Sequence, residues 1–182
     1  MTARTLALLA VLVALVGCAK QTCNDEPSGV PVDPVLMSFI GSARAAHHLA
    51  DGREENGDLP GAEAALRALL EGPLPPKRDA AEVREVLADT RARLAELKSQ
   101  RGDFDSALRD VDEGLGHVPE QSYFRGHLYE TRGLVEERRT KALTASGDLP
   151  GAGKARERAL TAFEEAMRIQ QAVIQGADGG TM

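Results

Sequence analysis

A six-residue phrase that occurs twice is the feature that most constrains the fold of this chain. "GDLPGA" stands at residues 57–62 and again at 147–152, and midway between them residues 102–107 read "GDFDSA". The three copies are therefore spaced by 45 residues, taken twice. A fixed period of this length is typical of repeat proteins, in which each repeat is one unit of packed secondary structure. The chain is expected to be an array of such units.

Each copy carries residues that end one helix and begin the next. Its glycine can adopt the left-handed conformation in which helices often stop, without the clash of a side chain. The aspartate that follows can accept the free amide protons at the start of a new helix, and a proline fits the first turn. These residues are Gly57, Gly102 and Gly147, then Asp58, Asp103 and Asp148, and Pro60 and Pro150. The phrase therefore predicts a tight turn between two helices.

Apolar and small residues recur at the same spacing around the phrase. Alanine stands five residues after each glycine, leucine thirteen after it, and a large apolar residue two after it. The three sets are Ala62, Ala107 and Ala152; Leu70, Leu115 and Leu160; and Leu59, Phe104 and Leu149. A small residue at a fixed point of a helix lets a neighbouring helix approach closely, so the pattern predicts a repeated helix pair.

The repeated unit resembles the tetratricopeptide repeat, a helix pair with a Gly-Asp-aromatic turn and a small residue early in its second helix. The middle copy matches this pattern best, at Leu94, Ala95, Gly102, Asp103, Phe104, Ala107, Val111, Gly114 and Pro119. The first copy matches it in part, at Leu49, Ala50, Ala62 and Leu66. The third copy departs, with Arg139 and Thr140 at the Leu-Gly positions. The resemblance implies an all-α, tetratricopeptide-like antiparallel helix-pair array. Because the 45-residue period exceeds the family's usual length of about 34, a longer-helix relative or a HEAT-like array remains open.

The apolar periodicity predicts about six helices and one helical repeat domain at residues 35–175. The helices are expected at 35–56, 60–71, 77–101, 104–116, 120–146 and 149–175. In the third helix one face carries Val83, Leu87, Thr90, Leu94 and Leu97, and in the last helix one face carries Ala155, Ala159, Phe163, Ala166, Gln170 and Val173. Residues 176–182 are expected to be a disordered tail.

The amino terminus is typical of an exported protein. Arg4 precedes an unbroken apolar run from Leu6 to Val16, which is too short to span a bilayer and indicates a signal peptide. The "LVGC" that ends this segment resembles the lipobox of bacterial lipoproteins. The resemblance implies cleavage between Gly17 and Cys18, which leaves 1–17 as the signal peptide, and lipidation of Cys18. The alternative is an ordinary signal peptide cut after Ala19, which would release a soluble exported protein.

The resemblance also implies an address in the bacterial cell envelope. Alanine rather than aspartate after the lipidated cysteine more often accompanies sorting to the outer membrane in that family, so the domain is expected to face the periplasm there. Residues 18–34 are rich in proline and lack a helical period, which predicts a flexible tether. Cys23 would be the only unlipidated cysteine, and no intramolecular disulfide is then possible.

Composition and motifs argue against catalysis, metal binding and nucleic-acid binding. The chain has 22 basic and 28 acidic side chains, a formal charge of −6, and no basic stripe. The four histidines are His47, His48, His117 and His127, and only the weak pair of His47 and Asp51 has the helical spacing of a metal site. No nucleophile with a base, paired acid and base, or phosphate-binding loop is visible. No cofactor or enzymatic activity is expected.

Two charged segments and one inner face are the candidate binding surfaces. The helix at 104–116 is rich in Asp and Glu, and "EERRTK" at 136–141 is a polar stretch inside a long helix. Each segment is either a solvated face or a binding surface. As binding surfaces, the acidic helix would contact a basic partner, and the polar stretch would project beyond the packed helix pair. Helix-pair arrays bind partners chiefly on concave faces, which favours the surface near Leu49, Leu94 and Tyr129.

These features together favour a lipid-anchored periplasmic scaffold or adaptor that binds another protein of unknown identity. Small repeat lipoproteins of this kind resemble pilotins, which implies a role in the assembly of an envelope machine. The alternative from another class is an envelope lipoprotein that binds a small ligand between its helix pairs. Few aromatic residues and many alanines disfavour the large apolar pocket that such a ligand would need.

Overall fold

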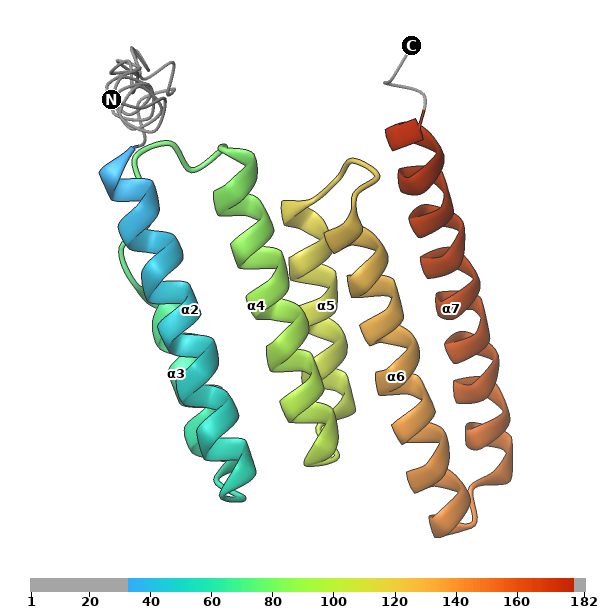
Figure 1. Cartoon of the computed structure of the whole chain (residues 1–182). Helices are drawn as coiled ribbons and strands as arrows, with labels where there is room; N and C mark the ends of the chain where they lie inside the picture. The colour runs from blue at the N-terminus through green and yellow to red at the C-terminus, as the bar shows by residue number, and fades with distance from the viewer. Residues whose placement is uncertain (1–32, 179–182) are drawn as a thin grey trace, which may run out of the picture. The chain divides into compact units, whose positions relative to one another are not determined.

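The computed structural model describes residues 33–178, and within them the chain is all-α with six helices and no strand (Figure 1). The helices are α2 (Pro34–Glu55), α3 (Leu59–Glu71), α4 (Ala81–Gln100), α5 (Phe104–His117), α6 (Tyr123–Ser146) and α7 (Leu149–Asp178). The predicted signal peptide, Gly17, Cys18, Cys23 and most of the predicted tether lie outside the described residues.

The three copies of the repeated phrase form the turns between α2 and α3, α4 and α5, and α6 and α7. Their glycines have positive φ angles of 77° at Gly57, 81° at Gly102 and 84° at Gly147, a backbone conformation that favours glycine. In each turn the next aspartate accepts a hydrogen bond from the amide three residues later. These bonds are Gly61 N to Asp58 at 2.9 Å, Ser106 N to Asp103 at 3.3 Å and Gly151 N to Asp148 at 2.9 Å.

Replacing Asp103 by alanine is expected to lower the free energy of unfolding by about 1 kcal/mol, because the Ser106 amide loses its acceptor at the start of α5. Urea denaturation followed by circular dichroism measures this change. Asp103→Asn keeps an acceptor oxygen and should cost less than half as much. Equal stability of wild type and Asp103→Ala would contradict the role of this carboxylate as a cap.

Two helices, α4 and α6, begin later than the periodicity predicts. Residues 77–80 form a turn in which the Ala80 amide donates to the Lys77 carbonyl, so α4 starts at Ala81 and not at 77. The Ser122 hydroxyl caps α6, which therefore starts at Tyr123 and not at 120.

The ends of the predicted domain also need correction. Asp33 accepts from the amides of Val35 and Leu36 at 2.9 and 3.3 Å, so α2 begins at Pro34, inside the predicted tether. Residues 176–178 belong to α7 and not to a disordered tail.

Each helix packs against its neighbours in a regular order. The pairs α2–α3, α4–α5 and α6–α7 pack internally, α4 packs on both helices of the first pair, and α6 packs on both helices of the second pair (Figure 1). No packing joins α5 to α7 or the first pair to the third. The side of α6 and α7 that faces away from the second pair therefore carries no further helix among the described residues.

Small and aliphatic side chains form the core between these helices. The α4 face that carries Val83, Leu87, Thr90, Leu94 and Leu97 is buried along its whole length, as its period predicts. The alanines of the repeated phrase, Ala62, Ala107 and Ala152, are all buried, as are Ala155, Ala159 and Ala166 of α7. In contrast, Leu149 and Leu160 of the third copy are exposed, although their counterparts in the first two copies are half-buried.

Candidate protein-binding site

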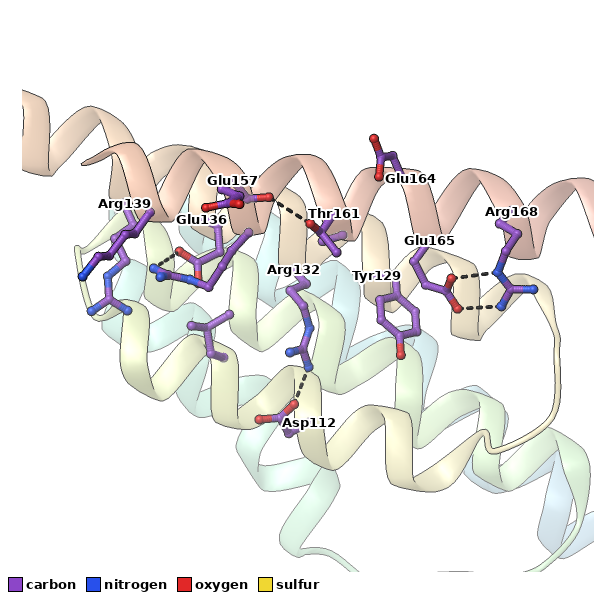
Figure 2. Close-up of a pocket in the computed structure, with 14 residues that line it drawn as sticks. Asp112, Tyr129, Arg132, Glu136, Arg139, Glu157, Thr161, Glu164, Glu165 and Arg168 are labelled. Atoms are coloured by element: carbon purple, nitrogen blue, oxygen red, sulfur yellow. Dashed lines mark hydrogen bonds and ion pairs between the residues drawn. The ribbon is translucent and has the colours of Figure 1, made fainter. Parts of the chain in front are cut away.

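A groove lies between α5 and α7, with α6 beneath it (Figure 2). Its volume is about 1100 Å³. The groove exists because α5 and α7 both pack on α6 without packing on each other. Leu108, Tyr129 and Ala162 supply apolar surface inside it, and arginine, lysine and glutamate side chains line the rest. A mixed apolar and charged groove of this kind suits a peptide segment better than a compact apolar ligand.

One ion pair, between a half-exposed arginine and a buried carboxylate, joins the two helices that form the third pair. Arg158 of α7 donates from Nε and Nη2 to the two carboxylate oxygens of Glu136 on α6, at 2.6 and 2.9 Å. Only 2% of Glu136 is exposed. The hydrogen bonds with Glu136 raise the pKa of Arg158, which keeps the guanidinium charged beside the carboxylate. This bidentate pair fixes the wall of the groove where α6 meets α7.

The other end of the groove is built around Tyr129. The guanidinium carbons of Arg125 and Arg132 lie 5.5 and 5.9 Å from the centre of its ring, within cation–π range. Arg132 also donates to Asp112 of α5, so the ring is held between fixed charges (Figure 2). Tyr129 is half-buried, which leaves part of its ring available to a partner.

A second ion pair, on α7, lies next to Tyr129 of α6. Arg168 donates from Nε and Nη2 to Glu165 at 2.8 and 2.6 Å (Figure 2). The hydrogen bond from Arg168 lowers the pKa of Glu165, and the same contact raises the pKa of Arg168. Both residues are one helical turn apart on a single helix, so they contribute charge to the groove without joining helices.

The three residues predicted to mark a binding face do not lie on one surface. Tyr129 lines the groove, and Leu49 is exposed on α2, a helix that does not pack against α6. Leu94 is 1% exposed and packs with Leu97 and Leu66 in the core, so it does not contribute to an exposed surface. Its match to the repeat pattern reflects packing and not recognition.

The carboxylates of the acidic helix have basic partners within the chain, although Asp105, Asp112 and Glu113 remain exposed to solvent. Asp110 is 3% exposed and accepts from Arg91 at 2.8 Å and from Lys98 at 2.5 Å, both on α4. Further carboxylates of α5 also have partners: Asp112 meets Arg132, Glu113 meets Arg91, and Asp105 meets Arg139. The sequence shows the acidic residues but not the arginines of α4 and α6 that neutralise them.

The polar stretch at 136–141 packs in part against other helices, while Lys141 at its end is exposed. Glu136 and Thr140 are buried, and Arg138 donates to the Ser99 hydroxyl of α4 at 2.8 Å. Neither interpretation from the sequence, a solvated face or a projection, therefore holds for the buried residues Glu136 and Thr140. Its polar residues are tolerated because they meet α4, α5 and α7 with satisfied hydrogen bonds.

The ion pair of the groove has a counterpart 45 residues earlier, with the charges reversed. Arg91 of α4 contacts Glu113 of α5 at 2.5 Å, and these positions are equivalent to Glu136 and Arg158. In the first pair the equivalent positions are Ala46 and Ala68, which line an open apolar groove of about 620 Å³. Alignment of the sequence to itself at its own period would have revealed this pair, because opposite charges exchange places at both positions.

The histidines do not form a metal site in the described residues, where no cluster of three or more His, Cys, Asp or Glu side chains has suitable geometry. His47 Nε2 lies 3.1 Å from the Thr90 hydroxyl, which explains its position between α2 and α4 without any ion.

His117 is expected to make stability depend on pH. Burial and the nearby charge of Arg91 lower its pKa, against a smaller opposing effect of Glu113. The unfolded chain, with a histidine pKa of about 6.5, therefore binds a proton more readily than the folded chain. Stability from this residue is complete above that pH and decreases as the pH falls toward the lower folded pKa. Melting temperatures at pH 7.5 and 5.5 should differ less in His117→Gln than in wild type, and an equal difference would contradict this.

No helix in residues 33–178 combines the length and the hydropathy needed to cross a membrane. Comparisons with protein-family models, with curated proteins and with solved structures find no match to this chain.

Proposed function

We propose that this chain is a lipid-anchored scaffold of the bacterial periplasm, which binds another protein and holds it near the outer membrane. The observation that carries the proposal is the groove over α6, with Tyr129 inside it and fixed ion pairs along its walls. A half-buried tyrosine flanked by arginines is the kind of residue on which protein interfaces concentrate their binding energy. Assembly of an envelope machine, as in pilotins, is the role we infer.

The repeat itself supports a tetratricopeptide-like arrangement. Contacts recur at the period of the sequence: Arg93 of α4 contacts Glu54 of α2, and the equivalent Arg138 of α6 contacts the equivalent Ser99 of α4. Each incoming helix therefore meets the preceding pair in a similar register. An array of this kind contributes binding surface and not catalysis, which is the reason to propose a scaffold and not an enzyme.

The lipid anchor rests on the "LVGC" motif at residues 15–18. Two or three acyl chains on Cys18 would hold the domain at the membrane far more firmly than one chain. Metabolic labelling with palmitate tests this directly. Wild type should incorporate the label and Cys18→Ala should not, whereas label that persists in Cys18→Ala, or a wild-type chain that takes up none, would contradict the anchor.

Site-specific photo-crosslinking in the native cell tests the binding function. A benzoyl-phenylalanine at Lys154, on the groove, should yield a discrete protein adduct, and one at Arg78, in the exposed segment before α4, should not. Tyr129→Ala should reduce the adduct at least about fivefold if the ring contributes as interface tyrosines do. Absence of any adduct at Lys154, or an adduct unaffected by Tyr129→Ala, would contradict a partner in this groove.

A further inference from the structure

An arginine recurs at one position of the array, and its surroundings differ between the two junctions of helix pairs. Arg93 of α4 and Arg138 of α6 are 45 residues apart and occupy equivalent positions. Arg93 is held by three carboxylates, Asp51 at 2.9 Å, Glu96 at 3.0 Å and Glu54. The first junction therefore surrounds its arginine with negative charge.

Two of the three equivalent positions around Arg138 lack a carboxylate. Ser99 stands where the first junction has Glu54, and Lys141 stands where it has Glu96. The third position is Glu96 itself, whose carboxylate already binds the arginine of the first junction. The Ser99 hydroxyl accepts from Arg138 Nη1 at 2.8 Å, and Arg138 forms no ion pair within residues 33–178. A hydroxyl and an ammonium group thus replace two carboxylates.

A pocket of about 510 Å³ lies beside Arg138, where the end of α4 and the start of α5 meet α6. It lies where two long side chains of the first junction are short in the second. Ser99 replaces a glutamate, and Ala142 replaces the fully buried Leu97. Phe104, which is half-buried, supplies an apolar wall. We name this hollow the Arg138 pocket, and its lining includes Ser99, Arg101, Phe104, Arg138, Lys141 and Ala142.

The Arg138 pocket is basic. Three cations line it, and none of its lining residues is a carboxylate. Two of the cations have partners outside the pocket, Arg101 with Glu63 at 2.8 Å and Lys141 with Glu137 at 2.6 Å. In the described part of the chain the charge of Arg138 is left without a carboxylate, in contrast to its equivalent in the first junction.

We propose that the Arg138 pocket binds a glutamate side chain of the partner protein, together with an aliphatic side chain next to it. The carboxylate meets Arg138 as Glu54 meets Arg93, through charge-assisted hydrogen bonds that a serine hydroxyl does not match. The aliphatic group fills the space that alanine leaves in place of leucine and packs on Phe104. This inference rests on the proposed function, since it assumes a protein partner, and it names the chemistry of the segment that is bound.

NMR titration of the detergent-solubilised full chain tests the pocket. The probe is an acetylated and amidated peptide, Gly-Leu-Glu-Glu-Leu-Gly, whose only charges are its glutamate side chains. We expect it to shift the Arg138 Nε–Hε signal and the Phe104 ring signals saturably, and the Phe104 signals report binding in every variant. The same peptide with glutamine at both central positions should bind at least about tenfold more weakly, because it loses the charge-assisted hydrogen bonds.

Two variants of the pocket and one matched control make the test specific. Arg138→Gln should weaken binding of the glutamate peptide at least about tenfold. Lys141→Glu changes an exposed side chain and places a carboxylate three residues after Arg138, the spacing of Glu96 after Arg93. It should therefore block the pocket, with the same loss of affinity, and leave the chain folded. Arg44→Gln removes an exposed arginine of α2 and should leave the affinity unchanged.

Three results would overturn the proposal. The first is the absence of a saturable shift, or equal affinity of wild type and Lys141→Glu for the glutamate peptide. The second is a response to inorganic phosphate at lower concentration than to the peptide, because the pocket would then be a phosphate site. The third is a dimer in sedimentation velocity that Lys141→Glu converts to a monomer, because the occupant would then be a second copy of the chain.

The titration and the crosslinking in the cell fail independently. Glutamate-selective binding that Lys141→Glu abolishes, with no adduct at Lys154, would contradict a partner in the groove over α6 and support the Arg138 pocket. An adduct at Lys154 without peptide binding would support the groove and overturn the Arg138 pocket.

Discussion

Replacing Arg158 by methionine is expected to lower the free energy of unfolding by about 2 kcal/mol, less than the loss of a fully buried pair because the Arg158 side chain is half-exposed. The substitution keeps most of the side-chain volume but leaves the Glu136 carboxylate, only 2% exposed, without the guanidinium that donates to both of its oxygens. A buried charge without a partner costs far more than a surface pair contributes. Urea denaturation at neutral pH measures the change.

The second pair provides the control for this prediction. Arg91 and Glu113 form an ion pair at equivalent positions with the charges exchanged, so the second pair accommodates the opposite orientation, although Glu113 is more exposed than Glu136 and Arg91 is shared with Asp110. The double variant Glu136→Arg with Arg158→Glu should therefore recover most of the stability that each single change removes. If the losses of the two single variants simply add in the double variant, the pair is not the unit that stabilises the contact between α6 and α7.

The helix boundaries set by the repeated phrase could be predicted because the chemistry is local. A left-handed glycine, a capping aspartate and a proline act within a few residues, and the starts predicted at 60, 104 and 149 lie within one residue of Leu59, Phe104 and Leu149. The starts predicted at 77 and 120 are three or four residues early. There the chain lacks the phrase, and the period of a helix face does not specify where the first turn begins.

The pairing of the charged residues is not evident from the sequence, because their partners lie on other helices. Glu136 lies in "EERRTK", which has the composition of a solvated stretch, yet it is 2% exposed and pairs with Arg158 of α7. Leu160 presents the opposite case, since its equivalents Leu70 and Leu115 are covered by the helix that follows them, whereas no helix within residues 33–178 covers Leu160. Burial depends on what packs next, which a periodic pattern alone does not contain.

The candidate site could be predicted only in part. Tyr129 was expected on an inner face and lines the groove, but Leu94 satisfies the same pattern and is buried in the core. The groove arises from the absence of packing between α5 and α7, a property of helix arrangement and not of any residue. The sequence therefore points to Tyr129 and to two charged segments that supply Asp112, Glu136 and Arg139 to the groove, but not to the wall formed by α7.

Replacing Leu128 by alanine is expected to destabilise the chain by about 3 kcal/mol, because it removes a fully buried side chain from the junction of the second and third pairs. Leu128 of α6 packs over Gly114 of α5, where a Cβ would lie 2.6 Å from Leu128 Cδ2. The cavity would thus open at the point where the two helices approach most closely through a glycine. Thermal unfolding should show a lower melting temperature with the helical content at 20 °C unchanged.

Substitution of Gly114 tests whether the loss of stability in Leu128→Ala comes from the contact between these two residues. In wild type, Gly114→Ala gains about 1 kcal/mol of helix propensity but drives a methyl group into Leu128, so a net loss of about 1 kcal/mol is expected. In the Leu128→Ala background the leucine methyls are gone, and the same substitution should become stabilising by up to about 1 kcal/mol as it fills part of the cavity. A change of sign between the two backgrounds measures the coupling of α5 to α6 directly. The same loss in both would show that Gly114 is required for a reason other than the approach of Leu128, such as the closeness of Arg91 Cβ, which would lie 3.2 Å from a Cβ at position 114.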